Sequence, residues 1–145
     1  MTVQRTLVLC KPDAMERRLG GEIIARMEKA GLKVVAMKMI WMDRELAQRH
    51  YAVHRDKPFF NDLVEFITSG PIIAAVFEGE DAIARVRKAM GATDPKKADP
   101  GTIRHDLAEN IQKNLVHGSD AEDTARTEIA IFFDEKEILD YKTVA

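Results

Sequence analysis

Apolar residues along this chain follow two different spacings, which predict an alternation of strands and helices. Consecutive or alternating apolar positions are typical of strands, whereas recurrence every three or four residues is typical of helices. By this criterion we expect strands over residues 5–10, 32–41, 71–77 and 128–133. Helices are expected over residues 14–30, 43–50, 59–68 and 81–90, with a helical turn or two over 107–113 and another helix after Ser119.

The same pattern predicts how deeply two of the strands are buried. Residues 32–41 are apolar at almost every position, which favours a strand buried on both faces. Residues 71–77 form the clearest apolar run, and such a run is typical of a central strand.

Polar residues ahead of helical segments predict where three helices begin. Asp13 and Glu16 have the spacing of a capping box, in which a side chain accepts a hydrogen bond from a backbone N–H one turn further on. Ser119 and Glu122 repeat that spacing. Asp43 is expected to cap the helix that follows it.

The order of these elements predicts the fold class. Strand, helix, strand, paired helices, strand, helix, long connection, helix and strand form a βαββαβ pattern with insertions. We therefore expect an α+β, ferredoxin-like fold, in which helices on one side cover a four-stranded antiparallel sheet. The connection after Met90 is rich in Pro, Asp and Thr, and we expect a substrate loop near residues 91–113 because long loops often bind ligands.

Composition narrows the class of protein. A chain of 145 residues, 46% of them hydrophobic and 32% charged, is expected to fold as one domain over residues 1–145. Its net charge of −2 argues against a surface for nucleic acid or acidic membranes. Without a run of ~20 apolar residues or a leader-like start, neither membrane insertion nor secretion is expected. Cys10 is the single cysteine, so no internal disulfide forms and a reducing, cytoplasmic location is expected.

The segment from Asn114 to Asp120 carries the strongest indication of chemistry. It places His117 beside Gly118 at an expected helix start, where unpaired N–H groups and a partial positive charge attract anions. Neutral imidazole is a competent covalent nucleophile, so His117 is a candidate acceptor of a phosphoryl group. The alternative is a solvated loop histidine beside an ordinary helix cap.

Other side chains are candidates for a phosphate site, and each has a structural alternative. Lys11 lies between a strand and a helix start, where its ammonium is able to reach a phosphate. Arg87, Thr93 and Arg104 flank the long loop, and two guanidiniums with a hydroxyl suit a polyphosphate. The alternative for all of these residues is a solvated surface.

Two further residues have roles that the pattern leaves open. Phe59 follows Pro58, and its ring either stacks on a base or belongs to the core. Glu128 is expected to share a strand face with apolar residues, so it either has a partner such as a histidine nitrogen or reaches solvent.

Three apparent signatures of other proteins do not hold. His54-Arg55-Asp56 with Asn61 matches the catalytic loop of protein kinases, but the chain has no glycine-rich phosphate loop or D-F-G sequence. His50 and His54 have a metal-ligand spacing but lack the glutamate of H-E-x-x-H, so no zinc site is expected there. There is no Walker motif, so any nucleotide is bound in another way.

Seven short motifs follow one another along nearly the whole chain. They are Lys11-Pro12-Asp13, His50-Tyr51, Pro58-Phe59-Phe60, Ser69-Gly70-Pro71, Gly91-Ala92-Thr93-Asp94-Pro95, Pro100-Gly101-Thr102-Ile103-Arg104 and Asn114-x-x-His117-Gly118-Ser119-Asp120. In this order and at this spacing they resemble the nucleoside diphosphate kinase family. The combination is far more specific than any single motif.

This resemblance implies a ping-pong reaction and the residues that perform it. His117 would take the γ-phosphoryl group of a nucleoside triphosphate, typically ATP, and a nucleoside diphosphate would then collect it. Glu128 would orient the His117 ring, and Ser119 would hydrogen-bond Glu128. Lys11 would contact phosphate and the ribose 3′-hydroxyl, and Tyr51 would line the pocket near the transferred group.

The resemblance also implies how the phosphates are bound. Arg87, Thr93 and Arg104 would bind the diphosphate. Mg²⁺ bridges the substrate phosphates in this family, and Asp120 would help to hold the water shell of that ion.

The ribose and the base would be bound separately. Asn114 would contact the ribose, while Phe59 would stack on the base and Ile111 would pack on its opposite side. Stacking would accept many bases, because every base has a π-face.

A non-catalytic ferredoxin-like ligand-binding module is the main alternative, and an RNA-binding domain is one form of it. The pI near 6.1 counts against RNA. An inactive regulatory relative is a further alternative, although every expected catalytic position is retained. A homo-oligomer is expected, with tetramer and hexamer both open.

Overall fold

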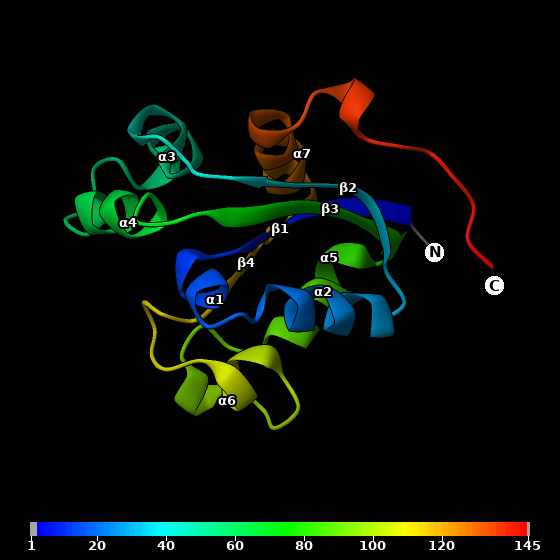
Figure 1. The fold of residues 1–145 in the computed structure, drawn as a ribbon, viewed down its shortest axis with the longest axis horizontal. Helices are drawn as coiled ribbons and strands as arrows, with labels where there is room; N and C mark the ends of the chain where they lie inside the picture. Colours follow the sequence, from blue (N-terminus) through cyan, green and yellow to red (C-terminus); the bar gives the residue numbers. More distant parts are fainter. Residues whose placement is uncertain (1–2, 145) are drawn as a thin grey trace.

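A single antiparallel sheet organises the molecule (Figure 1). The computed structural model describes residues 3–144, and its sheet has four strands in the order β2-β3-β1-β4. Their bounds are β1 (Val3–Cys10), β2 (Lys33–Ile40), β3 (Ile72–Glu80) and β4 (Val116–Gly118). Each neighbouring pair is antiparallel, which confirms the predicted ferredoxin-like α+β class.

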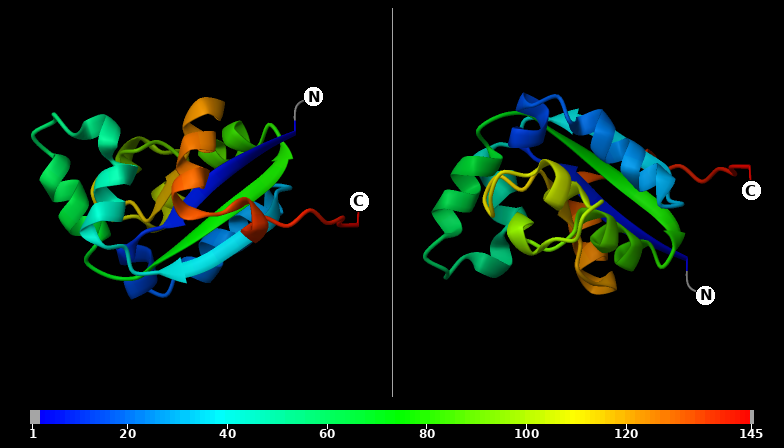
Figure 2. Two further views of the ribbon diagram at one scale, coloured as in Figure 1. Left: turned by 90° about the horizontal axis from the view of Figure 1, so that it is seen from above. Right: turned by 90° about the horizontal axis from the view of Figure 1, so that it is seen from below.

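Helices lie on both faces of this sheet, so the prediction that they cover one side is wrong (Figures 1 and 2). Val8 and Cys10 of β1 pack into one core, and Leu7 and Leu9 pack into the other. The first core includes residues of α1 (Pro12–Glu16), α2 (Gly20–Lys29), α5 (Ala82–Met90) and α6 (Ile103–Leu107). The second includes residues of α3 (Arg44–His50), α4 (Phe60–Ile67) and α7 (Glu122–Phe132). Short 3₁₀ turns lie at Ala52–His54, Pro95–Lys97 and Glu135–Glu137. A strand such as β1, which is covered by helices on both faces of the sheet, therefore carries apolar side chains on both of its faces.

The predicted strand at 32–41 occurs as β2, but its expected burial on both faces is wrong. β2 pairs only with β3 and forms one edge of the sheet in the described chain. Met37 and Met39 of this strand are more than half exposed. Apolar residues on both faces of β2 predicted that both faces are buried, but within the described chain Met37 and Met39 are left uncovered. The prediction for 71–77 is confirmed, because β3 is central and mostly buried.

The C-terminal part differs most from the predicted pattern. Residues 128–132 lie in α7, and the fourth strand is the shorter β4, so the predicted strand at 128–133 is wrong. Ala125, Glu128 and Phe132 are buried at helical spacing. Over the short stretch 128–133 the apolar residues also fit the alternation of a strand, which is why a strand was predicted there. The helical turn expected over 107–113 lies earlier, as α6, because Thr102 accepts a hydrogen bond from His105 N and caps it there.

Only one of the three predicted caps is present. Asp43 accepts a hydrogen bond from Leu46 N at 2.8 Å, as expected. Asp13 lies inside α1, and Ala121 rather than Ser119 precedes α7. The side chains of Asp13 and Ser119 instead form hydrogen bonds in the site described below. Among residues 3–144, no helix has the length and apolar character needed to cross a membrane.

Candidate active site

β4 brings His117 to the sheet face that α3 and α7 cover. His117 pairs with Leu9 of β1, and Leu9 belongs to the core on that face. Pairing continues past the strand, because Ser119 N donates to Leu7 O at 3.2 Å. Sheet pairing therefore fixes the position of both polar side chains.

Gly118, between them, allows β4 to lie close to α5. A Cβ atom at this position would lie 2.8 Å from Val86 Cγ1 and 2.9 Å from Met90 Sδ, and both of these residues are buried. Any larger residue here would therefore force the Val86 and Met90 side chains to shift.

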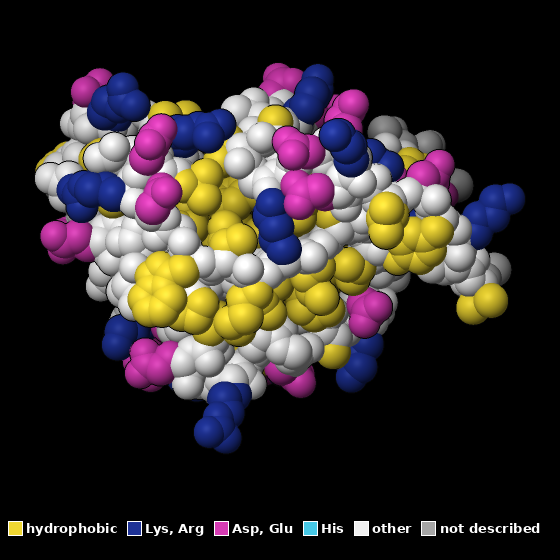
Figure 3. Space-filling model, turned by 45° about the horizontal axis from the view of Figure 1, so that its top comes forward, with side chains coloured by type: hydrophobic (Ala, Val, Ile, Leu, Met, Phe, Trp, Pro, Cys, Tyr) yellow, Lys and Arg dark blue, Asp and Glu magenta, His cyan; other side chains and the backbone are white. Residues whose placement is uncertain are grey.

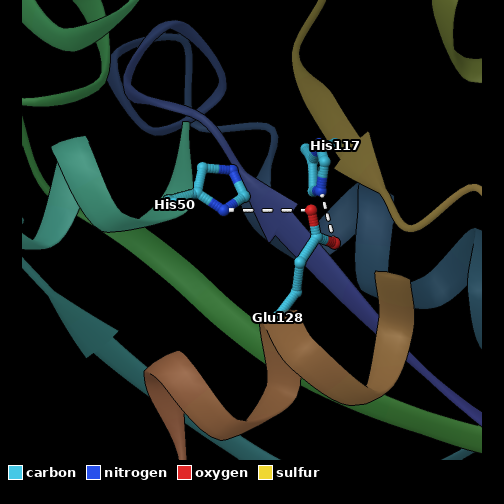
Figure 4. A group of neighbouring side chains, drawn as sticks. All are labelled: His50, His117 and Glu128. Carbon is cyan, nitrogen blue, oxygen red and sulfur yellow. Dashed lines mark hydrogen bonds and ion pairs between the residues drawn. The ribbon is translucent and has the colours of Figure 1, made fainter. Parts of the chain in front are cut away.

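Glu128 of α7 joins His117 and Ser119 through one carboxylate oxygen. His117 Nε2 lies 3.0 Å from Glu128 Oε1 (Figure 4). Ser119 Oγ donates to the same oxygen at 2.6 Å. Burial by itself raises the pKa of Glu128, but the hydrogen bond and charge of His117, with the Ser119 hydroxyl, outweigh burial and lower it. Glu128 is therefore an ionised acceptor.

An ionised Glu128 fixes the tautomer of His117. A carboxylate only accepts hydrogen bonds, so Nε2 carries the proton and donates it. No hydrogen bond within residues 3–144 engages Nδ1, and the His117 side chain is 27% exposed. The Nδ1 lone pair is consequently accessible to an electrophile.

His50, the last residue of α3, completes the cluster (Figure 4). Its side chain is 1% exposed, and its Nδ1 lies 4.0 Å from Glu128 Oε2. Neither ring nitrogen has a hydrogen-bond partner in the described part of the chain. The ring centroids of Tyr51, His117 and Phe132 lie 4.6, 4.8 and 5.5 Å from that of His50. Burial first, and then the charge of His117, lower the pKa of His50 to about 3, so its imidazole is neutral.

Replacing His50 by Gln is expected to flatten the pH dependence of stability. The pKa of His50 is about 3 in the folded chain against an ordinary 6.5, so between these values only the unfolded chain binds this proton. The free energy of unfolding therefore decreases as the pH falls from 6.5 toward 3, by up to about 1.4 kcal/mol per pH unit from this group. Denaturant unfolding with a metal chelator present measures it at several pH values. Parallel pH profiles of wild type and His50→Gln would contradict the prediction.

Lys11 and Asn114 form a second polar group beside this cluster. Lys11 Nζ donates to Asn114 Oδ1 at 2.7 Å, and Asn114 Nδ2 donates to Thr93 O at 3.2 Å. Burial lowers the pKa of Lys11 to about 8; the charge of Asp13 opposes this shift, and that of Arg104 adds to it. A cation and an amide side by side suit an anionic ligand with hydroxyl groups.

Asp13 supports the backbone that presents Asn114, and sequence reasoning missed this role. Its Oδ2 accepts a hydrogen bond from Leu115 N at 3.0 Å, and Lys11 N donates to Leu115 O at 2.9 Å. Leu115 has a φ of 75°, which is strained for a side chain of this size. Burial raises the pKa of Asp13 although the charge of Lys11 opposes it. The sequence offered a helix-cap spacing and a family motif for Asp13, but it contains no local signal for a bond to Leu115.

Comparison with known proteins decides between an enzyme and a binding module of this fold. The family model for nucleoside diphosphate kinase matches residues 4–138. The chain belongs to the nucleoside diphosphate kinase family. It is therefore an enzyme that transfers phosphoryl groups between nucleotides, and the non-catalytic alternative is not favoured.

Nucleoside diphosphate kinases of several organisms are similar to this chain over nearly their whole length. The protein of Dehalococcoides mccartyi (strain ATCC BAA-2266 / KCTC 15142 / 195) is 58% identical over 139 residues, which are 96% of this chain and 98% of that protein. The protein of Thiobacillus denitrificans (strain ATCC 25259 / T1) is 58% identical over 138 residues, or 95% and 97% of the two chains. The solved structure of a halophilic enzyme from Halobacterium salinarum in complex with CDP has a TM-score of 0.94 at 51% identity, covering 98% of this chain and 95% of that chain. An Aquifex aeolicus enzyme has a TM-score of 0.92 at 45% identity, covering 95% and 100%.

Arg104, a predicted phosphate ligand of this nucleoside diphosphate kinase, is buried and bonded to the backbone. Its guanidinium donates to Val116 O at 2.7 Å, Gly91 O at 3.1 Å and Asn114 O at 3.4 Å. Burial lowers its pKa to about 10, and the charge of Arg87 contributes to the decrease. Arg104 thus ties the loop after Gly91 to the segment that leads into β4, whereas Arg87 is exposed on α5.

The remaining predicted residues are more exposed than Arg104. Tyr51 is half-buried against His50, and burial, followed by the charge of Glu128, raises its pKa to about 12, so the hydroxyl stays protonated. Phe59 is 42% exposed at the start of α4, and Ile111 is 58% exposed. α4 and the segment that carries Ile111 lie near each other at one end of the molecule (Figures 1 and 2).

The side chains of Thr93 and Asp120 are exposed. Thr93 is bonded through its carbonyl oxygen, which accepts a hydrogen bond from Asn114 Nδ2. Asp120 follows the buried Ser119 directly. His50 is the other residue that sequence reasoning missed, because its spacing to His54 was compared only with a metalloprotease motif; the motif His50-Tyr51 was the signal available.

Proposed function

We propose that this chain moves the γ-phosphoryl group of a nucleoside triphosphate, typically ATP, to a nucleoside diphosphate through a phosphohistidine at Nδ1 of His117. The observation that supports this most strongly is the 3.0 Å pairing of His117 Nε2 with Glu128 Oε1. This pairing holds the proton on Nε2 and leaves the Nδ1 lone pair for the phosphorus.

In the first half-reaction Nδ1 of His117 attacks the γ-phosphorus while the bond from that phosphorus to the β,γ-bridging oxygen breaks. An N–P bond forms, and the nucleoside diphosphate leaves with the electron pair of the broken bond. The imidazole keeps its Nε2 proton and becomes cationic, and Glu128 stabilises that charge through their hydrogen bond. A terminal phosphate oxygen of a second nucleoside diphosphate then attacks the phosphorus and restores neutral His117.

The phosphates are assigned to the cationic residues beside His117. Lys11 would contact phosphate and the ribose 3′-hydroxyl, and Arg87, Thr93 and Arg104 would bind the diphosphate. The charges of Lys11 and Arg104 lie close enough for Arg104 to lower the pKa of Lys11. Such a preorganised positive field is what a phosphoryl transition state requires.

The nucleoside is assigned to residues around the same polar centre. Asn114 would contact the ribose through its amide, Phe59 would stack on the base, and Ile111 would pack opposite. Ile111 lines a pocket of about 310 Å³ with Asp94 and Pro95. The similar Halobacterium salinarum enzyme was solved with CDP, which supports nucleotide binding here.

We assign Mg²⁺ as the cofactor, held mainly by substrate phosphates. Mg²⁺ prefers oxygen ligands and usually keeps several waters. Asp120 offers one exposed carboxylate, whereas Glu128 is already bonded to His117 and Ser119. One carboxylate acting through water fits an ion whose other ligands are substrate oxygens. When bound, Mg²⁺ neutralises phosphate charge.

We place the enzyme in the cytoplasm. Cys10 is a buried free thiol, and burial raises its pKa to about 12. An unpaired, unreactive cysteine is consistent with a reducing compartment. The net charge of −2 supports the absence of a membrane or nucleic-acid surface.

We also infer a homo-oligomer in which the free edge of β2 meets a second copy of this chain. Met37, Met39 and Trp41 are 53, 60 and 66% exposed along this edge. Figure 3 shows a band of hydrophobic side chains across this face. An apolar edge strand is normally covered, and a second copy presents the matching edge. A tetramer or a hexamer can be built from such pairs.

Met39→Glu is therefore expected to weaken self-association by about 100-fold or more, because two carboxylates would meet at a contact between identical edges. Sedimentation at several protein concentrations measures the change in mass. Val53→Glu is a matched control, because Val53 is 84% exposed outside the β2 edge. An unchanged mass for Met39→Glu would exclude this edge as the contact.

Incubation with ATP labelled at the γ-phosphorus and Mg²⁺ tests the phosphohistidine. We expect a protein-bound label that is stable to base and labile to acid, located on His117, and removed by an added nucleoside diphosphate. Nucleotide binding without any label would instead favour the ligand-binding alternative.

A further inference from the structure

His50, His117 and Glu128 together have the donor set of a transition-metal site. They come from three elements, α3, β4 and α7, and converge on one point (Figure 4). One ligand atom from each residue lies within 4.8 Å of the others. Two imidazoles and one carboxylate are the protein ligands of a common class of zinc site with an open fourth position.

His50 is the member whose presence the phosphoryl transfer does not explain. Its side chain is 1% exposed, yet neither ring nitrogen has a hydrogen-bond partner in the described chain. Leaving a buried polar atom unpaired is unfavourable, so such a group calls for a ligand or another explanation. His50 is neutral because burial lowers its pKa to about 3, and neutral imidazole is the form that ligates metals.

We propose that His50, His117 and Glu128 bind a borderline-soft divalent cation such as Zn²⁺, and that the bound ion blocks phosphoryl transfer. Imidazole nitrogens favour zinc and similar metals, whereas Mg²⁺ favours oxygen ligands, so the two ions are directed to different places. This site is thus separate from the Mg²⁺ carried by the substrate.

Only small movements are needed to form the site. Ligand atoms around tetrahedral zinc lie about 3.3 Å apart, given metal–ligand bonds of about 2.0–2.2 Å. His117 Nε2 and Glu128 Oε1 are 3.0 Å apart, and His50 Nδ1 and Glu128 Oε2 are 4.0 Å apart. All three donor atoms lie within 4.8 Å of one another, so movements of the side-chain ends by up to about 1.5 Å bring them to this spacing.

The block follows from which atoms the ion uses. Zinc binds the lone pair of Nε2 of His117, so the proton of the neutral ring lies on Nδ1 and no Nδ1 lone pair is left to attack the phosphorus. It also occupies the carboxylate that stabilises the phosphorylated imidazole. This second half of the proposal rests on the proposed function of His117, whereas metal binding itself does not.

Calorimetric titration of the nucleotide-free protein with ZnCl₂ tests the binding. Wild type is expected to bind one Zn²⁺ at this cluster, and His50→Gln is expected to bind it at least tenfold more weakly. His54→Gln is the matched control, because His54 is a half-buried histidine that lies outside the cluster. Circular dichroism confirms that each variant is folded.

Cobalt(II) provides a second readout that does not depend on affinity. The visible spectrum of four-coordinate Co²⁺ is expected with wild type and His54→Gln but not with His50→Gln. Equal zinc affinity and an equal cobalt spectrum for wild type and His50→Gln would overturn the site and would leave the proposed phosphohistidine unaffected.

Transfer assays test the inhibition, with Mg²⁺ in excess so that nucleotides carry Mg²⁺. Each variant is compared with its own zinc-free rate. Zinc is expected to inhibit wild type and His54→Gln reversibly, with recovery on chelation, while His50→Gln requires at least tenfold more zinc. Zinc bound at the cluster without any loss of rate would overturn the inhibitory part.

Discussion

His117→Ala is expected to reduce phosphoryl transfer by about 10⁴-fold or more, because it removes the atom that accepts the phosphoryl group. Binding by Lys11, Asn114 and the arginines stays, so the variant is expected to bind nucleotides with affinity close to wild type. The decisive measurement is the transfer rate from ATP to a nucleoside diphosphate, together with the labelling of the protein by γ-labelled ATP. Both signals are expected to disappear together.

His105→Ala is the control for the loss of a histidine as such. His105 is exposed on α6 and contacts Asp106 at 3.0 Å, away from the cluster, so its replacement is expected to leave transfer and labelling unchanged. The His117 side chain is 27% exposed, so its truncation is expected to change the free energy of unfolding by about 1 kcal/mol or less. Full turnover by folded His117→Ala would exclude the phosphohistidine mechanism.

The sequence predicted the sheet better than it predicted the elements at its edges. β1 and β3 are central and carry long apolar runs, so their positions and burial followed from pattern alone. β2 carries the same pattern, but Met37 and Met39 are exposed, and pattern alone does not distinguish exposed apolar residues of an edge strand from core residues. β4 has only three residues, which is too short for a periodic signal.

The position of Glu128 shows how a residue was identified correctly for a wrong structural reason. It was expected to need a polar partner because it shares a face with apolar residues, and it has partners in His117 and Ser119. The face belongs to a helix, not to a strand. Alternation over 128–133 and helical spacing over 125–132 share Glu128 and Phe132, and the longer window is the one that the fold uses.

Local sequence also could not reveal the bonds that connect distant segments. Asp13 and Leu115, or Arg104 and Gly91, meet only because β1 and β4 pair and α5 packs beneath them. Motif resemblance placed Asp13 and Arg104 near the site, but their bonds to backbone atoms required the folded chain. The motifs contain residues that shape the site as well as residues assigned to the substrate.

Glu128→Ala is expected to lower kcat by about 100-fold, and to raise KM by no more than about threefold, because its carboxylate acts on His117 rather than on the nucleotide. Removing the carboxylate that orients a catalytic imidazole lowers rates by up to about 10⁴-fold in serine proteases, which sets an upper bound. Here the ring is also held by the pairing of β4 with β1 and by the packing of His50 at 4.8 Å. The loss is therefore expected to be smaller.

Glu128→Gln separates orientation from charge. A Gln carbonyl oxygen still accepts hydrogen bonds from His117 Nε2 and Ser119 Oγ, but it does not neutralise the cationic phosphoimidazole. If orientation dominates, Gln recovers most of the rate, whereas if charge dominates, Gln is nearly as slow as Ala. We expect an intermediate rate about tenfold below wild type, because the lowered pKa of Glu128 shows that the native site contains the ionised carboxylate.

Ser119→Ala completes the comparison. Ser119 donates to Glu128 at 2.6 Å and forms no hydrogen bond with His117 in the described structure, so its loss is expected to lower kcat by less than about tenfold. Single-turnover formation of the phosphoenzyme, measured for all three variants, reports the chemical step without product release. A large rise in KM with unchanged kcat for Glu128→Ala would show that the carboxylate serves nucleotide binding instead, and the role assigned to the Nε2 hydrogen bond would then be wrong.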